Sequence, residues 1–391
     1  MATFLLTWEL GGGLGHLVPL RALAIGLRQR GHRAVVAVND LPGASALMSE
    51  IPCIPAPVHV PLRSRMIAEP STFADLLYNA GCADESILQG LAFGWRSLFE
   101  VIDPDVVVMD FSPAALVALQ GCRPRRVLLG CGHSCPPDVS PLPDLCPWRD
   151  NYPDRLRQTE SQVLEALNRQ LARQFAPPLA RVAELFQRVD LNLLTTFAEL
   201  DHYQVRGAAD YWGVLADLPG EHPTWPDGSW PRVFVYLKPR GEVGPLLAEL
   251  GRRNLSTIAY VPKAAGARQA ALPSCLHITD QPLDLEQILA TCDVAILNAG
   301  HNTTARALLA GKPILALPIS GEQQVVANNA ARLGAAVSVT GRPDECIAGL
   351  EKLLADERFA QAARVFAAKY ATFDSRRLLS SILDHLESLA S

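Results

Sequence analysis

The chain has 391 residues, of which 49% are hydrophobic and 19% are charged, and its formal net charge is −5. This length favours two domains, each able to bury its own core. The dispersed, slightly acidic charge disfavours a nucleic-acid binder, and no apolar run is long enough to predict a membrane span. The start, MATFLLTWELGGG, has no signal-peptide pattern, and the nine cysteines form no CxxC pair, so we expect a cytoplasmic protein with reduced thiols.

Short apolar runs alternate with helical periodicity along the first half of the chain. The predicted strands are residues 3–8, 33–38, 53–58, 105–110, 126–129 and 191–196. The predicted helices are residues 16–30, 83–102, 112–120 and 154–189, the last one broken at the proline pair 177–178. This alternation predicts a parallel sheet with helices on both faces. The proline-rich stretch 135–153 has no periodicity and is predicted to be a functional loop.

The same rhythm restarts after Gly213, and the proline-rich stretch 218–231 is predicted to connect two domains. The predicted strands of the second half are residues 233–237, 257–261, 277–279, 294–297, 314–318 and 335–339. The predicted helices are residues 242–252, 285–291, 302–310 and 323–333, and helices follow from residue 343 to a last one at 375–389.

A glycine turn follows the buried strand 294–297 and leads into a helix, with the sequence Asn298-Ala-Gly300-His301-Asn302-Thr303. Such a turn directs backbone N–H groups and the positive end of the helix at one point, which suits a phosphate. The point lies at the carboxyl end of a parallel strand, where open α/β sheets bind ligands. Taken singly, Asn302 and Thr303 could equally be ordinary helix caps; the ordered set favours ligand binding.

Glu322 and Gln323 follow the next predicted strand along the chain. A carboxylate and an amide at a strand end can hold neighbouring hydroxyls, which suits a sugar ring. The alternative for Glu322 is a first-turn acid that complements the helix dipole.

The first half carries Gly11-Gly-Gly13-Leu-Gly15-His16-Leu-Val-Pro19 directly after its first strand. A dinucleotide fingerprint is one interpretation, but the third glycine comes too early. The other interpretation makes His16 a general base, since a histidine has a suitable unperturbed pKa. Asp110 ends a strand of the same sheet and could orient the imidazole.

Together these segments resemble the inverting GT-B glycosyltransferases, the superfamily of UDP-glycosyltransferases and bacterial antibiotic glycosyltransferases. The donor pattern appears as GHNT at 300–303, AGKP at 310–313, EQ at 322–323 and NA at 329–330, and the catalytic motif as GHLVP at 15–19. The resemblance implies two facing Rossmann-like domains, 1–213 and 214–374, with the active site between them. It also implies that a last helix, 375–391, crosses back to the first domain.

The resemblance further implies a hexose transfer from a nucleotide-diphosphate sugar, UDP favoured over TDP, to the hydroxyl of a small-molecule acceptor. His16 would be the base and Asp110 its partner, with no metal and no other cofactor. In the donor site, Asn302 and Thr303 would touch the diphosphate, and Glu322 and Gln323 would hold the sugar.

Two positions depart from the family pattern. Asn298 stands where relatives carry a histidine that contacts the pyrophosphate, so Lys238 and Arg240 are candidates to neutralise the phosphate charge. Arg306 stands where plant members carry a glutamate that binds the ribose.

Acceptor contacts are expected from the irregular regions 61–80 and 131–153, with His133 and Trp148 as candidates. A zinc site at Cys131-Gly-His133-Ser-Cys135 is disfavoured by its spacing. Two other functions keep the fold: a nucleotide-sugar epimerase, and a non-catalytic partner protein that activates another enzyme.

Overall fold

The computed structural model describes residues 1–150, 152–215, 220–262 and 272–391. These form two compact units. Unit 1 comprises residues 1–196, 201–216 and 374–391, and unit 2 comprises residues 197–200 and 217–373. Of the connection predicted at 218–231, residues 218 and 219 lie outside the described residues.

Unit 1 is built on a parallel six-stranded sheet with the strand order β3-β2-β1-β4-β5-β6. Its strands are β1 (Thr3–Trp8), β2 (Arg33–Val38), β3 (Cys53–Pro55), β4 (Val106–Asp110), β5 (Arg125–Gly130) and β6 (Leu191–Leu194). Its helices are α1 (Leu14–Gln29), α2 (Leu41–Leu47), α3 (Phe73–Asn79), α4 (Glu85–Ile102), α5 (Pro113–Ala118), α6 (Pro153–Arg173) and α13 (Ser375–Leu389), with short 3-10 turns η1 (Arg63–Arg65), η2 (Gly132–Ser134) and η3 (Val182–Gln187).

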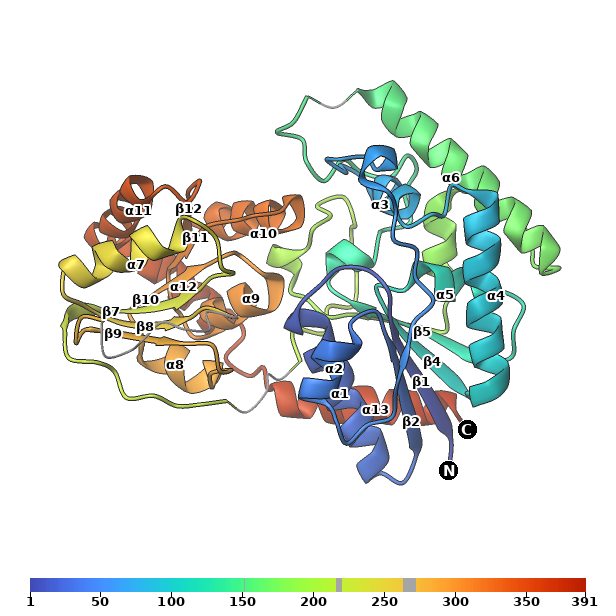
Figure 1. Ribbon diagram of the computed structural model, residues 1–391, viewed down its shortest axis with the longest axis horizontal. Coiled ribbons are helices and arrows are strands. Elements are labelled where there is room, and N and C mark those ends of the chain that lie inside the picture. The colour runs from blue at the N-terminus through green and yellow to red at the C-terminus, as the bar shows by residue number, and fades with distance from the viewer. Residues whose placement is uncertain (151, 216–219, 263–271) are drawn as a thin grey trace. The chain divides into compact units, whose positions relative to one another are not determined.

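Both faces of this sheet are covered, which explains why the middle of its strands is largely apolar. On one face Leu5 and Met109 pack with α3 to α6. On the other, Phe4 and Leu6 pack with α1, α2 and α13. Figure 1 shows the strands between these two groups of helices. The strand β1 is therefore central, and its carboxyl end lies beside that of β4, where Trp8 is in register with Asp110.

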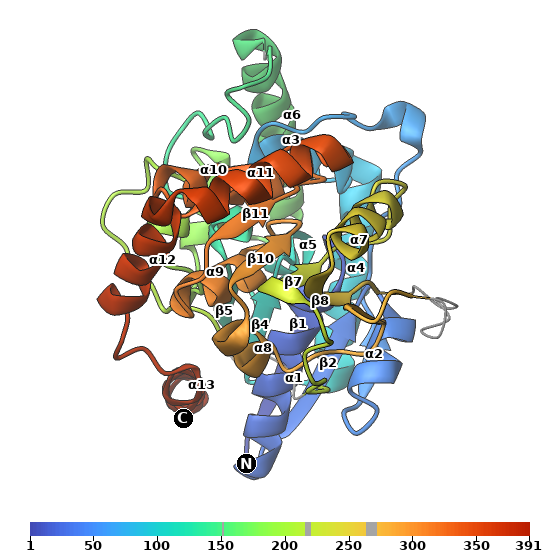
Figure 2. The ribbon, with the colours of Figure 1, turned by 90° about the vertical axis from the view of Figure 1, so that its left-hand side faces the viewer.

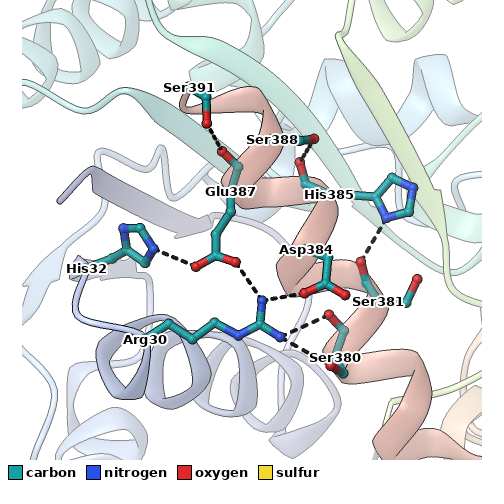
Figure 3. Close-up of polar contacts among 9 residues, drawn as sticks. All are labelled: Arg30, His32, Ser380, Ser381, Asp384, His385, Glu387, Ser388 and Ser391. Atoms are coloured by element: carbon teal, nitrogen blue, oxygen red, sulfur yellow. Dashed lines mark hydrogen bonds and ion pairs between the residues drawn. The ribbon is translucent and has the colours of Figure 1, made fainter.

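The last helix, α13, packs on α1 of unit 1 (Figure 3). Gly26 allows this approach, because a Cβ at that position would lie 2.5 Å from a methyl group of Leu383. At the rim, Arg30 donates to Asp384 at 2.6 Å and to Glu387 at 2.7 Å. His32 Nε2 also lies 2.7 Å from Glu387. Apolar contacts and an ion-pair cluster thus fix α13 to unit 1.

Unit 2 repeats the topology with the strand order β12-β11-β10-β7-β8-β9, again all parallel. Its strands are β7 (Ser229–Tyr236), β8 (Leu255–Tyr260), β9 (Leu276–Thr279), β10 (Val294–Leu297), β11 (Ile314–Ala316) and β12 (Ala336–Ser338). Its helices are α7 (Val243–Arg252), α8 (Leu285–Thr291), α9 (His301–Leu309), α10 (Gly321–Arg332), α11 (Pro343–Ala355) and α12 (Glu357–Lys369), with the turn η4 (Ala198–Leu200). The helices α7 and α11 pack together over one face, while α8 and α9 lie against the other (Figure 2).

The predicted alternation of strands and helices, and hence the doubly wound α/β class, is confirmed in both units. Two short helices, α2 and α3, were not predicted, because seven residues give too few turns for a clear apolar period. The helix predicted over 154–189 ends at Arg173, ahead of the proline pair, and continues as the turn η3. Among the described residues, no helix combines the length and the apolar character that a bilayer crossing needs.

Candidate active site

His16 and Asp110, which are 94 positions apart in the chain, meet at the carboxyl edge of the unit 1 sheet. His16 lies in the first turn of α1, whose N-cap is Gly13, and Asp110 is the last residue of β4. The Nδ1 atom of His16 lies 3.0 Å from Oδ2 of Asp110. The side chain of Asp110 is 6% exposed and that of His16 is 23% exposed. A buried carboxylate thus faces a partly accessible imidazole.

This contact determines which nitrogen of His16 can act as a base. An ionised carboxylate only accepts hydrogen bonds, so Nδ1 carries the proton and Nε2 holds the lone pair. Gly11 borders Nε2: a Cβ added at Gly11 would lie 2.7 Å from that atom, and the φ angle of Gly11 is +85°. Glycine at this position therefore leaves room beside the basic nitrogen.

Aromatic rings surround the imidazole of His16. Trp8 stacks on it, with ring centroids 5.1 Å apart at an interplanar angle of 18°. Phe111 lies 6.3 Å away on another side, and His133 contacts Phe111 edge-on at 5.6 Å. His133 thus contacts Phe111, which itself lies near His16. The contact of His133 with the acceptor stays a prediction.

Trp148, the second predicted acceptor residue, lies on a loop between η2 and α6 and is 45% exposed. This loop is fastened to the segment before α3, because Leu145 N donates to Ser71 O at 2.7 Å. The buried carboxylate of Asp75 in α3 binds Arg155 of α6 at 3.0 Å.

Glu9 is a residue of this edge that the sequence analysis did not single out. It directly follows β1 and is buried, and its carboxylate accepts hydrogen bonds from Ala114 N at 3.0 Å and Ala115 N at 2.6 Å, at the start of α5. Burial raises the pKa of Glu9 to about 8, while the two backbone hydrogen bonds act in the opposite direction. A glutamate at the end of a fully apolar strand was the available signal.

In unit 2, Asn298 joins the carboxyl ends of three strands. Its Oδ1 accepts from Lys238 N, after β7, at 2.6 Å, and its Nδ2 donates to Leu317 O, after β11, at 2.8 Å. The next residue, Ala299, has a φ angle of +58°. The sequence predicted that Asn298 binds the donor, whereas both polar atoms of its side chain bind the protein backbone.

The helix α9 begins directly after this turn. Its N-cap is Gly300, which has no side chain to accept a bond from the first-turn N–H groups. Neither Asn302 nor Thr303 is therefore the N-cap, which was the alternative to ligand binding. Both are half-buried in the first turn, while His301 is buried and Arg306 lies half-buried in the next turn.

Two cations follow β7 beside this turn. Lys238 and Arg240 line one pocket together with Asn298 and Ile319, at the carboxyl edge of the unit 2 sheet. Lys238 is exposed, and Arg240 Nε lies 3.8 Å from Glu242, with both side chains about half exposed. The structure thus brings the two predicted phosphate partners next to the turn that precedes α9.

Glu322 and Gln323 lie in the first turn of α10. The side chain of the N-cap Ser320 accepts from Gln323 N at 3.3 Å, and Gln323 Oε1 accepts from the N–H of Ile319, the residue before the cap, at 2.9 Å. Glu322 is half-buried. The Oε1 atom of Gln323 therefore serves the helix start, and only its NH₂ group is left for the predicted sugar contact.

The cysteine cluster considered as a zinc site lies beside β5. Cys135 is buried, its thiol donates to Gly130 O at 3.6 Å, and burial raises its pKa to about 12. Among the described residues, His, Cys, Asp and Glu side chains form no group of three or more that could hold a metal ion.

Comparisons with known proteins place this geometry in context. No protein-family model matches the sequence. The chain is 24% identical over 374 residues to the zeaxanthin glucosyltransferase of Pseudescherichia vulneris, which spans 88% of this chain and 89% of that protein. The glycosyltransferase SsfS6 of Streptomyces sp. SF2575, solved with thymidine diphosphate, superposes with a TM-score of 0.67 at 19% identity, covering 99% of this chain and 100% of that one.

The chain is similar in sequence to a glucosyltransferase and shares its overall fold with solved glycosyltransferases. The spinosyn rhamnosyltransferase SpnG in complex with thymidine diphosphate gives a TM-score of 0.70 at 17% identity, with 99% and 100% of the two chains covered. These comparisons confirm the predicted GT-B fold, and the relative and structural neighbours are glycosyltransferases, as the sequence predicted.

Proposed function

We propose that this protein is an inverting glycosyltransferase that moves a hexose from a nucleotide-diphosphate sugar to an acceptor hydroxyl without a metal ion. The observation that carries the proposal is the His16–Asp110 pair, whose basic Nε2 borders Gly11. The similarity to a glucosyltransferase over most of both chains supports it. A cytoplasmic location stays a prediction.

The proposed reaction is a direct displacement. The acceptor oxygen attacks the anomeric carbon as Nε2 of His16 removes its proton. The bond from that carbon to the phosphate oxygen breaks, and the nucleotide diphosphate leaves with the electron pair. Asp110 stabilises the imidazolium that forms and holds the ring in its tautomer. Attack from the face opposite the leaving group inverts the configuration.

Unit 2 supplies the groups that would receive the leaving diphosphate. The first turn of α9, with Asn302 and Thr303, directs N–H groups and the positive helix end at it. Lys238 and Arg240 add positive charge beside the same turn. We assign Asn298 the task of holding Lys238 in place, since its amide binds the Lys238 backbone. Glu322 is the proposed partner of the sugar hydroxyls.

The nucleotide and the acceptor can be proposed by class. UDP was favoured from the sequence, while structural neighbours were solved with thymidine diphosphate, so both nucleotides belong in the donor panel. For the acceptor we propose a lipophilic aglycone with a free hydroxyl. The similarity to an enzyme named for zeaxanthin supports this. So do the exposed apolar side chains of Leu62, Met66 and Trp148 in the regions predicted to bind the acceptor.

A mass-spectrometric screen tests transfer directly. UDP- and TDP-hexoses are incubated with zeaxanthin, a macrolide aglycone, a phenol and a free sugar. We expect a glycosylated product with a lipophilic acceptor, and an α-linked donor should give a β-linked product by NMR. Replacing His16 with Ala should lower the rate by about 10²- to 10⁴-fold. Near-normal transfer by a folded His16→Ala protein would refute the base assignment.

The same experiment separates the alternatives. An epimerase would change the sugar of the donor without any acceptor, and NMR of the donor detects this. A non-catalytic partner protein would give no product of either kind, whether or not calorimetry detects donor binding. Retention of configuration in the product would contradict the single displacement.

A further inference from the structure

Glu9 is the buried carboxylate at the active-site edge that the proposed mechanism does not use. It is 5% exposed and lies at the edge of the apolar core that β1, α4 and α5 share. Burial of an ionisable group is costly unless hydrogen bonds compensate it. The hydrogen bonds of Glu9 therefore have to offset the cost of burying its carboxyl group.

Its contacts join two turns that are a hundred residues apart. Glu9 belongs to the turn after β1, which continues into Gly11 and the loop before His16. Its carboxylate binds Ala114 N and Ala115 N, which belong to the helix that follows Asp110. Beside it, Leu10 N donates to Phe111 O at 3.1 Å. Three hydrogen bonds thus connect the turn that leads to the base with the turn that carries its partner.

The turn after β4 needs such a connection, because it is strained. Phe111, the residue after Asp110, has a φ angle of +48°, in the left-handed region that a bulky side chain rarely adopts. A backbone in this conformation persists only where its surroundings hold it. The Glu9 carboxyl group and the Leu10 backbone N–H hold the turn after β4 in this conformation. Ser112 Oγ also contributes, because it donates to Asp110 O at 3.1 Å.

We propose that Glu9 is a positioning residue for the His16–Asp110 pair. Its carboxylate fixes the start of α5, and through it the strained turn that aims Asp110 at His16 Nδ1 and keeps Gly11 beside Nε2. It touches neither substrate nor the transferred proton. This inference rests on the proposed function for its kinetic effect, but not for its structural effect.

Glu9→Gln tests the proposal. The glutamine oxygen can accept from only one of the two N–H groups, and its NH₂ group would face the other. We expect kcat to fall by about 10- to 100-fold while the Michaelis constants change by less than about threefold, because the site is misaligned rather than emptied. The acid limb of the pH–rate profile should move to lower pH, since a carboxylate that is held less firmly stabilises the imidazolium less.

Asp105→Asn is the matched control. Asp105 joins the same two strands at their opposite, amino ends, where its Oδ2 accepts from Thr3 N at 2.8 Å. The Asp105→Asn substitution should lower the melting temperature without changing kcat or the acid limb of the pH–rate profile. Equal losses of kcat in both variants at equal losses of melting temperature would mean that Glu9 acts only through stability, and would overturn the proposal.

The positioning role of Glu9 can also be tested without catalytic turnover, so that its failure is distinguishable from the failure of the proposed function. Side-chain ¹⁵N NMR of the histidines, with His16 assigned by its replacement, reports the tautomer of His16. We expect a proton on Nδ1 in the parent protein and a mixture of tautomers in Glu9→Gln. Asn39→Ala removes the bonds from Asn39 Nδ2 to Glu9 O at 2.6 Å and to Gly11 O at 3.4 Å but leaves the Glu9 carboxyl contacts in place, so it should shift the same signal less. An unchanged His16 signal in Glu9→Gln would refute the positioning role even if no transfer is detected.

Discussion

The fourth strands of the two units, β4 and β10, occupy equivalent places in their sheets. A polar residue lies at the end of β4 and directly after β10, and in each case the next residue is in the left-handed region. In unit 1 these residues are Asp110 and Phe111, and in unit 2 they are Asn298 and Ala299. The side chains of Asp110 and Asn298 have different kinds of hydrogen-bond partner. Asp110 reaches a side chain, His16, whereas Asn298 binds two backbone groups.

The helices that follow these turns differ in the same way. The first N–H groups of α5 are bound by the internal carboxylate of Glu9, whereas α9 begins at Gly300. One unit thus closes this helix end with its own buried carboxyl group, and the other has no side chain at the equivalent cap. The comparison supports our proposal that one backbone pattern serves two roles, proton transfer in unit 1 and diphosphate binding in unit 2.

Asp110→Asn would give unit 1 the side chain of unit 2, and we expect the largest effect from it. An amide carries no charge to stabilise the imidazolium and can favour the wrong tautomer, so kcat should fall by about 10³- to 10⁴-fold. Steady-state rates measure this, with calorimetry to show that donor affinity is retained. A loss below about tenfold would mean that Asp110 is not the partner of the base.

Gly11→Ala tests whether space beside Nε2 distinguishes the catalytic turn. The new methyl group would lie 2.7 Å from Nε2, on a backbone with φ of +85°, so we expect kcat to fall by about 100-fold. The control is Gly12→Ala, because a Cβ at Gly12 has nothing within 4 Å. Similar rates for the two variants would contradict the role of Gly11.

Asn298→Asp gives unit 2 the side chain of unit 1. The carboxylate can still accept from Lys238 N but would repel Leu317 O and add negative charge near the proposed diphosphate. We expect donor affinity to fall by about tenfold and stability by about 1 to 3 kcal/mol. Asn254→Asp adds the same charge at the start of β8, at the opposite edge of the sheet, and should leave calorimetric donor binding unchanged.

The pH dependence of stability tests the buried carboxyl group of Glu9. Glu9 has a folded pKa raised to about 8 from 4.5, so its contribution is full below about pH 4.5 and is lost as the pH rises through about 8. The stability of the parent protein relative to Glu9→Gln should therefore fall by on the order of 3 to 4 kcal/mol between about pH 5 and pH 8. Urea unfolding measures this. A relative stability that rises over this range would show that the N–H groups of Ala114 and Ala115 outweigh burial.

The local sequence pattern determined most of the secondary structure of this protein. The apolar runs and helical periods predicted the strands and most helices, since burial on both faces of a parallel sheet leaves a clear pattern. The motif at 11–19, the strand that ends at Asp110 and the pattern at 300–330 led to the prediction of His16, Asp110 and the turn before α9 as site residues, because ligands of open α/β sheets bind at strand ends.

Only the tertiary structure decided which atoms meet. The Nδ1 contact of His16, the use of both amide atoms of Asn298 and the bond from Gln323 to its own helix start depend on side-chain directions, which residue types do not specify. The partners of Glu9 are a hundred positions away, and no local pattern records a contact of that length. The sequence by itself therefore determined the fold and the residue types at each strand end, and three-dimensional packing determined which of them face a substrate and which hold the backbone.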